Sequence, residues 1–341
     1  MTTDPFRAGI VETARHRTAF IEAGPVDGPL MIFAHGWPEL GIIWEHQLAH
    51  FAALGWRCVA PDMRGYGGSS VPTRTCDYSV RAITRDMVEL HNALGGAPAI
   101  WVGHDWGCAP VWSIAAHHPD RCRGVVALCV PYFARGNTAE NMIATVDRRL
   151  YPIDRYPAGQ FDYWLYHREH AGPAADALEA DVRATIAASF RRTAPDVVGK
   201  PSKFSELRSR GGFFGPGRRA PQMARDETMM SEALFAAFVT AFNRTGFRGA
   251  NAWYLNDADN AVYAREAPGF GRIDLPALFI HADRDTVCDT MHSGLAEPMR
   301  GDCTALTESV VEAGHMLMLE DPEGVTRAVA GWLDEASLST P

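Results

Sequence analysis

The chain has 341 residues, of which 47% are apolar, and its formal net charge is −9. This length allows one large domain or two, with a sizeable apolar core. The negative charge argues against nucleic acid or an anionic membrane as a partner. No stretch approaches the roughly 20 consecutive apolar residues of a membrane span.

The N-terminal residues and the cysteine pattern predict a protein of a reducing compartment. Residues 1–24 carry charges throughout, without the apolar segment of a secretory signal. The seven cysteines are scattered and form no C-x-x-C pair. We therefore expect reduced thiols and a cytoplasmic protein. No metal-ligand spacing is visible, and we expect no metal and no cofactor.

The first part of the chain alternates apolar runs with helical patterns. Strands that are apolar throughout and alternate with helices indicate a parallel sheet covered by helices on both faces. The pattern pauses after residue 130 and returns near the C-terminus. Strands are predicted at residues 30–33, 57–60, 99–102, 124–130, 277–280 and 304–311, and helices at 43–54, 79–94, 107–118 and 322–336.

The middle of the chain shows helical stretches and no strand alternation. These stretches, at 174–190 and 228–243, are joined by segments rich in proline and glycine such as 211–221. A helical insertion between two halves of an α/β sheet is best explained as a cap over the carboxyl ends of the strands, where such sheets bind ligands. We predict a core of residues 1–131 and 272–341, with a helical cap at 132–271.

Residues 103–107 read Gly-His-Asp-Trp-Gly and directly follow the predicted strand at 99–102. Flanking glycines permit a strand-to-helix turn that pushes the central side chain into a cleft. Here the central residue is Asp105, whose carboxylate would attack carbon and leave an ester on the enzyme. This chemistry favours a strained ring or a carbon that bears a halide. A turn with a capping aspartate is the simpler alternative.

Two later segments supply partners for such a nucleophile. His315 follows the last predicted strand and is a candidate general base, although a surface histidine is the alternative. Asp285 follows the strand at 277–280 and is placed to orient the imidazole. Asp283 is its local rival, to which we assign a turn hydrogen bond. The order nucleophile, acid, histidine is that of α/β-hydrolases.

The run His35-Gly36-Trp37-Pro38 follows the first predicted strand. A turn there would present the backbone N–H of Trp37 to the cleft, where it would form an oxyanion hole with the N–H of Trp106. The peptide bond before Pro38 is a candidate for the cis form. An ordinary strand-to-loop turn is the alternative.

The leaving group decides which substrate the nucleophile serves. A ring oxygen becomes an alkoxide and needs an acid, whereas a halide needs only N–H donors. The predicted cap contains Tyr163, Tyr166 and Tyr254, and a phenol with a pKa near 10 can donate to an alkoxide at neutral pH. The alternative is that these tyrosines are packing residues of the cap.

The chain resembles the epoxide hydrolases of the α/β-hydrolase fold, in their cap-bearing class, from His35 to about Leu333. The resemblance implies an α/β-hydrolase core with a mostly parallel sheet, a helical cap inserted after the sixth strand, and hydrolysis of a small-molecule epoxide by water. It depends on segments 35–39, 62–69, 103–107, 161–163, 246–249, 253–254 and 314–315. By resemblance, the nucleophile is Asp105, the base His315, its orienting acid Asp285, the ring-opening acids Tyr163 and Tyr254, and the oxyanion-hole amides those of Trp37 and Trp106.

Two features depart from this family. Cys108 stands where a further glycine is common, and the cap segment 199–219 is long and rich in glycine and arginine. A haloalkane dehalogenase is the second hypothesis, because an indole N–H at Trp106 can bind halide. A catalytically silent binding protein is the third, and the intact set of aspartates and histidine argues against it. The sequence leaves open whether the protein forms a homo-oligomer.

Overall fold

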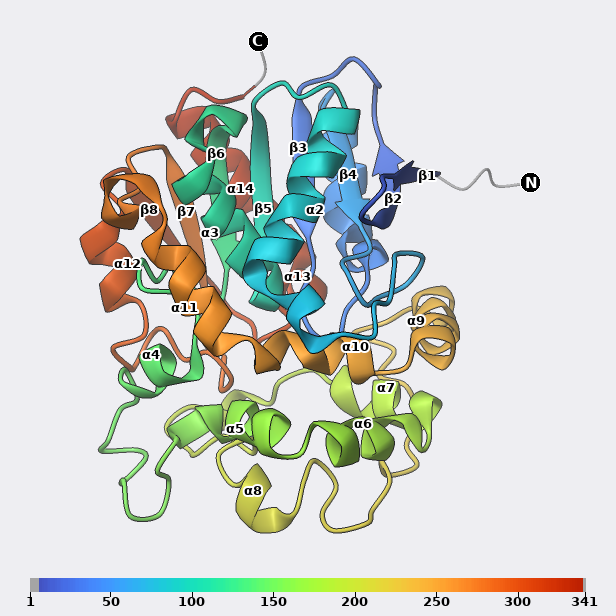
Figure 1. The fold of residues 1–341 in the computed structure, drawn as a ribbon, viewed down its shortest axis with the longest axis vertical. Coiled ribbons are helices and arrows are strands. Elements are labelled where there is room, and N and C mark those ends of the chain that lie inside the picture. Colours follow the sequence, from blue (N-terminus) through green and yellow to red (C-terminus); the bar gives the residue numbers. More distant parts are fainter. Residues whose placement is uncertain (1–5, 340–341) are drawn as a thin grey trace.

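The structure, a computed structural model, describes residues 6–339 and is built on one eight-stranded sheet (Figure 1). The strands are β1 Arg7–Glu12, β2 Arg17–Ala23, β3 Leu30–Ala34, β4 Arg57–Pro61, β5 Ala99–His104, β6 Cys122–Leu128, β7 Ala277–Ala282 and β8 Leu306–Val311. They lie in the order β1-β2-β4-β3-β5-β6-β7-β8.

The sheet is mostly parallel. β1 and β2 pair antiparallel, as do β2 and β4, and all pairs from β4 through β3 to β8 are parallel. The carboxyl ends of β3, β5, β7 and β8 therefore meet at one edge of the sheet. Ligands of α/β sheets bind at this edge, where the strand order reverses.

Helices cover both faces of the sheet, as predicted. In Figure 1, α2 and α3 lie in front of the sheet and α14 lies behind it; α2 contacts α3, and α1 contacts α14. The Ser79 hydroxyl caps α2, and Asp321 caps α14, which begins with Pro322. The helices of this part are α1 Glu45–Ala53, α2 Val80–Ala93, α3 Cys108–His117, α12 Glu297–Asp302, α13 Leu317–Glu320 and α14 Pro322–Glu335.

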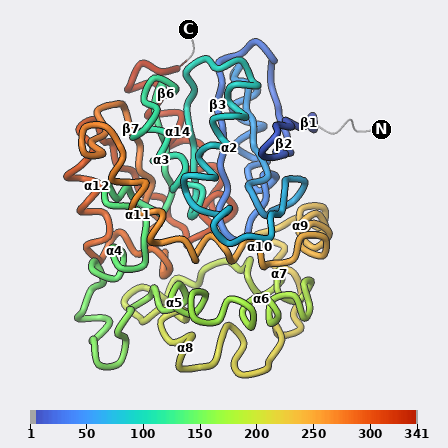
Figure 2. The backbone as a smooth tube through the Cα atoms, in the orientation of Figure 1, coloured from blue at the N-terminus to red at the C-terminus, as the bar shows by residue number. Residues whose placement is uncertain are grey.

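The chain between β6 and β7 is helical, which confirms a helical insertion after the sixth strand. The smooth trace of Figure 2 shows this segment, coloured green to orange, leaving the sheet and returning to it. Its last helix, α11, contacts α2 of the core; the boundaries 132–271 stay a prediction. The helices are α4 Ala139–Ile143, α5 Asp162–Glu169, α6 Ala171–Glu179, α7 Val182–Ser189, α8 Leu207–Arg210, α9 Glu232–Thr245, α10 Arg248–Asn251 and α11 Asp257–Arg265.

Short 3-10 helices connect many of these elements. They are η1 Gly41–Trp44, η2 Thr75–Tyr78, η3 Asp105–Gly107, η4 Pro119–Arg121, η5 Gly159–Phe161, η6 Pro195–Val197, η7 Ala252–Leu255 and η8 Pro268–Gly271.

The sequence analysis missed two strands and joined two helices. β1 and β2 escaped notice because β1 is a short edge strand whose side chains are exposed or half-buried, with a charged residue at each end. The helical stretch at 174–190 divides into α6 and α7, because the carboxylate of Asp181 accepts the Ala184 amide and starts a new helix. The last strand begins at Leu306, two residues later than predicted.

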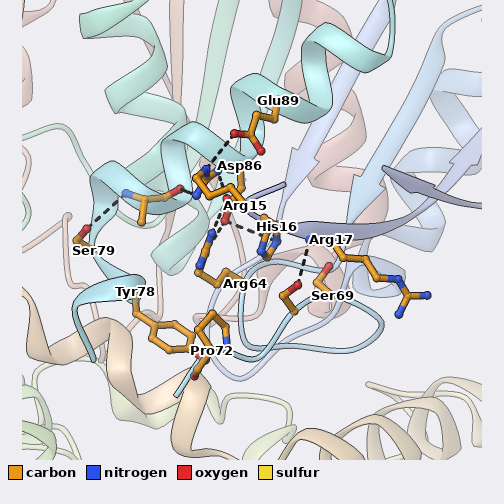
Figure 3. Close-up of polar contacts among 12 residues, drawn as sticks. Arg15, His16, Arg17, Arg64, Ser69, Pro72, Tyr78, Ser79, Asp86 and Glu89 are labelled. Atoms are coloured by element: carbon orange, nitrogen blue, oxygen red, sulfur yellow. Dashed lines mark hydrogen bonds and ion pairs between the residues drawn. The ribbon is translucent and has the colours of Figure 1, made fainter. Parts of the chain in front are cut away.

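A buried ionic network ties the β1–β2 turn and the loop after β4 to α2 (Figure 3). Asp86 of α2 is 1% exposed and receives two hydrogen bonds of 2.7 Å from the Arg64 guanidinium. Arg15 also donates to Asp86, and its Nε donates to Glu89 at 2.9 Å. Nε2 of His16 lies 3.6 Å from Oδ2 of Asp86. The network holds the 62–69 loop, whose Arg64 carbonyl accepts the Trp253 indole of the insertion.

Within residues 6–339, no helix combines the length and the apolar character of a membrane span. All seven cysteines are free thiols, as predicted. The cytoplasmic location stays a prediction.

Candidate active site

Asp105 stands at the tip of a sharp turn between β5 and α3. Its backbone φ is +48°, in the left-handed region that a residue with a side chain rarely adopts. The turn closes because Gly107 packs on the loop after β3: a Cβ on Gly107 would lie 2.2 Å from the Ala34 carbonyl oxygen. The glycines of the motif thus permit the turn, as predicted, and the strained backbone lies at Asp105.

The Asp105 carboxylate has a different partner at each oxygen. Oδ1 accepts a hydrogen bond of 2.7 Å from the Trp37 backbone N–H. Oδ2 lies 3.5 Å from Nε2 of His315. The Trp37–Pro38 peptide is cis, as the sequence suggested. Trp106 directly follows Asp105 within η3, and the oxyanion role of its amide stays a prediction.

Asp285 holds His315 from the other side of the ring. Nδ1 of His315 donates to Oδ2 of Asp285 at 2.7 Å. The second oxygen of Asp285 accepts the backbone amides of Val287 and Cys288 at 2.7 and 2.9 Å, so the carboxylate is fixed by its own loop. Asp283 takes no part: its carboxylate lies 3.6 Å from Arg284. The structure therefore brings Asp105, His315 and Asp285 together.

The charges of Asp105, Asp285 and His315 act on one another and outweigh burial in setting the protonation of these three side chains. Burial by itself would lower the pKa of His315, but Asp285 and Asp105 together raise it well above its usual value. Burial would raise the pKa of both aspartates, but His315 lowers the pKa of each. The resting site is thus an imidazolium between two carboxylates.

A buried pair that the sequence analysis did not single out, Glu39 and His104, lies next to Asp105. Nδ1 of His104 is 2.7 Å from Oε1 of Glu39, and its Nε2 donates to the His315 carbonyl at 2.8 Å. Oε2 of Glu39 accepts the Gly36 amide at 2.7 Å. The pair connects the loop after β3, the elbow and the His315 loop. The signal available in the sequence was His104, an ionisable residue at the end of the otherwise apolar strand β5.

Two cap tyrosines reach the same site. Tyr163 of α5 and Tyr254 of η7 are 7% and 2% exposed, and their ring centroids lie 5.8 Å apart. Burial raises the pKa of both phenols well above the usual value, and the negative charge of Asp105 adds to the effect at each, so both carry their protons. Asn251 accepts the Trp37 indole N–H at 3.0 Å and ties the insertion to the loop after β3.

A cavity of about 480 Å³ contains these groups. Such a volume suits a small organic ligand. Its lining combines the polar residues Asp105, Tyr163, Tyr254, His315 and Glu320, the cations Arg191, Arg192, Lys200, Lys203 and Arg210, and apolar residues that include Leu178, Val197, Phe204, Leu207, Phe213, Phe214, Val287 and Met316. Neither Tyr166 nor Trp106 is part of the lining formed by the described residues.

Two trios of side chains bring possible metal-ligand atoms within 4.8 Å of one another, and both include His315. One adds His104 and Cys129, and the other adds Asp285 and Cys288. Nδ1 of His315 and Nε2 of His104 already donate hydrogen bonds in these groups. Their arrangement is that of a hydrogen-bonded acid–base group.

The strand order and the sharp turn after β5 define an α/β hydrolase fold, in which the residue at the tip of that turn is Asp105. The chain belongs to the α/β hydrolase fold family, whose pattern matches residues 29–322. It is 32% identical to Epoxide hydrolase A of Mycobacterium tuberculosis over 95% of this chain and 96% of that protein. It is 31% identical to Bifunctional epoxide hydrolase 2 of Sus scrofa over 93% of this chain, and spans about half (53%) of that relative's length.

A solved structure agrees with these relatives. The epoxide hydrolase from an endophytic Streptomyces has a TM-score of 0.81 to this chain at 29% identity, covering 98% of this chain and 96% of its own. The resemblance stated from motifs therefore extends over nearly the whole chain.

Proposed function

We propose that this protein is an epoxide hydrolase that opens a small-molecule epoxide to a vicinal diol through an ester on Asp105. The observation that carries the proposal is the shared cavity: a carboxylate nucleophile and two protonated phenols, Tyr163 and Tyr254, line it together. The relatives named epoxide hydrolase support the same activity.

The first half-reaction is carbon alkylation. Oδ2 of Asp105 attacks a ring carbon, the carbon–oxygen bond of the ring breaks, and a phenol proton passes to the leaving alkoxide. Oδ1 stays on the Trp37 amide and becomes the carbonyl oxygen of the ester. Because the phenols are buried, water cannot take their place as the donor to the alkoxide. Their hydrogen bonds therefore stabilise the transition state strongly.

The second half-reaction is ester hydrolysis. Alkylation removes the negative charge from Asp105, and with it one of the two charges that raise the pKa of His315. The imidazolium can then pass its proton to the phenolate left by the first half-reaction and, held by Asp285, act as base toward water. Water attacks the ester carbonyl, and the charge that develops on Oδ1 meets the Trp37 amide. The proton taken from water returns His315 to the imidazolium. The bond between the carboxyl carbon and Oδ2 then breaks, and the departing alkoxide takes the remaining proton of the water, so the diol leaves and Asp105, His315 and the phenol return to their starting states.

A single turnover in heavy-oxygen water tests the ester. The oxygen added to the epoxide carbon comes from Asp105, so the diol of the first turnover should carry light oxygen and later diols should carry the solvent label. Enzyme labelled by many prior turnovers should reverse the pattern. Solvent label in the first diol would mean direct attack by water and would overturn the mechanism.

The haloalkane dehalogenase alternative has less support. Halide binding by the elbow tryptophan needs the Trp106 indole at the cavity, yet Trp106 packs against Trp164 and Tyr254, with centroids 4.8 and 5.1 Å away. It does not line the cavity among the described residues, whereas both tyrosines do. Parallel incubation with a styrene-oxide-type epoxide and a bromoalkane should give diol from the first and no bromide from the second.

A further inference from the structure

Residues 191–219 have a charge opposite to that of the whole chain. This segment contains eight lysines and arginines and two carboxylates, in a protein of net charge −9. It runs from the end of α7 through α8. In Figure 1, α8 lies on the side of α5 and α6 that faces away from the sheet. The segment therefore runs from a contact with the core, where Arg192 donates to the Glu320 carbonyl at 3.0 Å, to the outer side of the insertion at α8.

Five of these cations line the cavity that also contains Asp105, His315 and the two tyrosines: Arg191, Arg192, Lys200, Lys203 and Arg210. The one carboxylate other than Asp105 in the lining is Glu320 among the described residues. Both of its oxygens are occupied, by Thr193 and by the Gly314 amide. A cleft lined by one sign of charge concentrates ligands of the opposite sign.

Lys203 and Arg210 stand side by side without a counter-charge. Nη2 of Arg210 donates to the Lys203 carbonyl at 2.9 Å, and Nζ of Lys203 lies 5.0 Å from the centroid of the Phe204 ring. Within residues 6–339, no carboxylate forms an ion pair with either cation. By contrast, Lys200 pairs with Asp196 at 2.7 Å.

The electrostatics of this pair favour an anion. Desolvation, and then the neighbouring Arg210 charge, lowers the pKa of Lys203. A bound anion would oppose this shift because it offsets the like charge of Arg210, and it can reach the pair because both residues are exposed. Three ammonium donors and the free guanidinium donors are available to it.

We propose that Lys203 and Arg210 form an anion subsite that selects epoxides joined through an apolar spacer to an anionic group, such as a carboxylate. The inference rests on the proposed function and adds its substrate class. The apolar lining residues, such as Phe204, Leu207 and Phe213, contact the spacer. The ring lies at Asp105 while the anion lies at the cation pair, so the spacer length that joins them is fixed by the protein.

Matched substrates test the subsite. The probes are terminal epoxides of straight-chain carboxylic acids whose spacers grow by one methylene, each with its methyl ester and a trimethylammonium analogue. At one spacer length, KM for the acid should be about tenfold lower than for its ester, equivalent to about 1.4 kcal/mol. The cationic analogue should bind less well than either. High salt should reduce the preference.

Variants separate a subsite from a general positive field. The double variant Lys203→Gln/Arg210→Gln should lose the acid preference and keep kcat for the ester. Arg218→Gln is the matched control, because Arg218 is an exposed cation of the same segment that does not line the cavity. It should keep the preference. The subsite would be overturned by a preference for the acid that is equal at all spacer lengths. It would also be overturned if Arg218→Gln reduced this preference as much as the double variant does.

Binding without turnover keeps the two proposals distinguishable. Calorimetric titration with the saturated carboxylate of the best length, and with its methyl ester, should show acid binding about tenfold tighter in the wild type and equal binding in the double variant. Equal binding in the wild type would refute the subsite even if every epoxide is opened. If no epoxide is opened but the acid still binds preferentially, the proposed function fails and the anion site stands.

Discussion

The Nε2 atom of His315 lies 3.5 Å from Oδ2 of Asp105, the carboxylate oxygen that the Trp37 amide leaves free. The two side chains therefore control each other's charge. While Asp105 is ionised it stabilises the imidazolium of His315, and once Asp105 is an ester that stabilisation is lost. In the proposed mechanism, His315 therefore becomes able to act as a base only after the ester on Asp105 has formed.

His315→Gln should allow alkylation and block hydrolysis. Loss of a general base typically slows its step about 10² to 10⁴-fold, so the ester should accumulate. Intact-protein mass spectrometry after incubation with substrate should show an adduct of substrate mass on the variant. The double variant Asp105→Ala/His315→Gln is the control and should show none. An inactive, unmodified single variant would place the role of His315 before ester formation.

Asp285→Asn should slow hydrolysis far more than Asp283→Asn. Asp285 accepts from His315 at 2.7 Å, whereas Asp283 faces Arg284. Removing the charge lowers the pKa of His315 and frees its ring to rotate. We expect at least about a hundredfold loss in the rate of ester breakdown, measured by rapid quench, against less than about threefold for Asp283→Asn. The opposite ranking would exchange their roles.

The sequence predicted the elements whose patterns are local. Buried parallel strands such as β5 are apolar throughout, and the glycines around Asp105 predict the turn. Because the carboxyl ends of parallel strands share one edge, the order of strands and loops along the chain was enough to place Asp285 and His315 beside Asp105. The turn predicted after β3 likewise placed the backbone amide of Trp37 at the same edge of the sheet.

The remaining features depend on contacts between distant segments. β1 pairs with β2 by backbone hydrogen bonds and buries little, so its side chains show no strand pattern. The Glu39–His104 pair forms between residues 65 positions apart. The cavity wall at Lys203 and Arg210 belongs to a glycine-rich segment without regular periodicity, so its position depended on the packing of the whole insertion.

Tyr163→Phe and Tyr254→Phe should each slow alkylation by roughly a hundredfold, because a buried donor to a developing alkoxide is worth a few kcal/mol. The double variant should be nearly inactive yet folded, and breakdown of an ester already formed should be little changed. Stopped-flow measurement of single turnovers separates the steps. Tyr166→Phe is the control, since Tyr166 does not line the cavity. Full epoxide activity in both single variants would make these tyrosines packing residues.

Asp86→Ala should destabilise the fold by about 3 to 5 kcal/mol, because it leaves the buried guanidinium of Arg64 without its partner. Arg81→Gln breaks a bidentate but exposed pair with Glu266 and should cost less than about 1 kcal/mol. Urea unfolding at neutral pH measures both. Equal losses would show that the network in Figure 3 contributes no more than a surface pair.

His167→Phe should make the protein less sensitive to acid. The His167 ring is buried, stacks on Tyr254 with centroids 4.4 Å apart, and has no partner for either nitrogen among the described residues. Burial lowers its pKa from 6.5 to about 3. Between these values the unfolded chain binds a proton that the folded protein does not, so the free energy of unfolding falls as pH decreases through this window.

The variant retains an aromatic ring against Tyr254 and removes that linkage. At about pH 5 the wild type should lose about 1 to 2 kcal/mol through His167, relative to pH 7, that the variant does not lose. Thermal unfolding at both pH values measures the difference. His50→Gln is the control, because the exposed His50 ring meets solvent in both states. If wild type and His167→Phe show the same change in stability with pH, the imidazole is protonated in the folded protein and its position against Tyr254 has another basis.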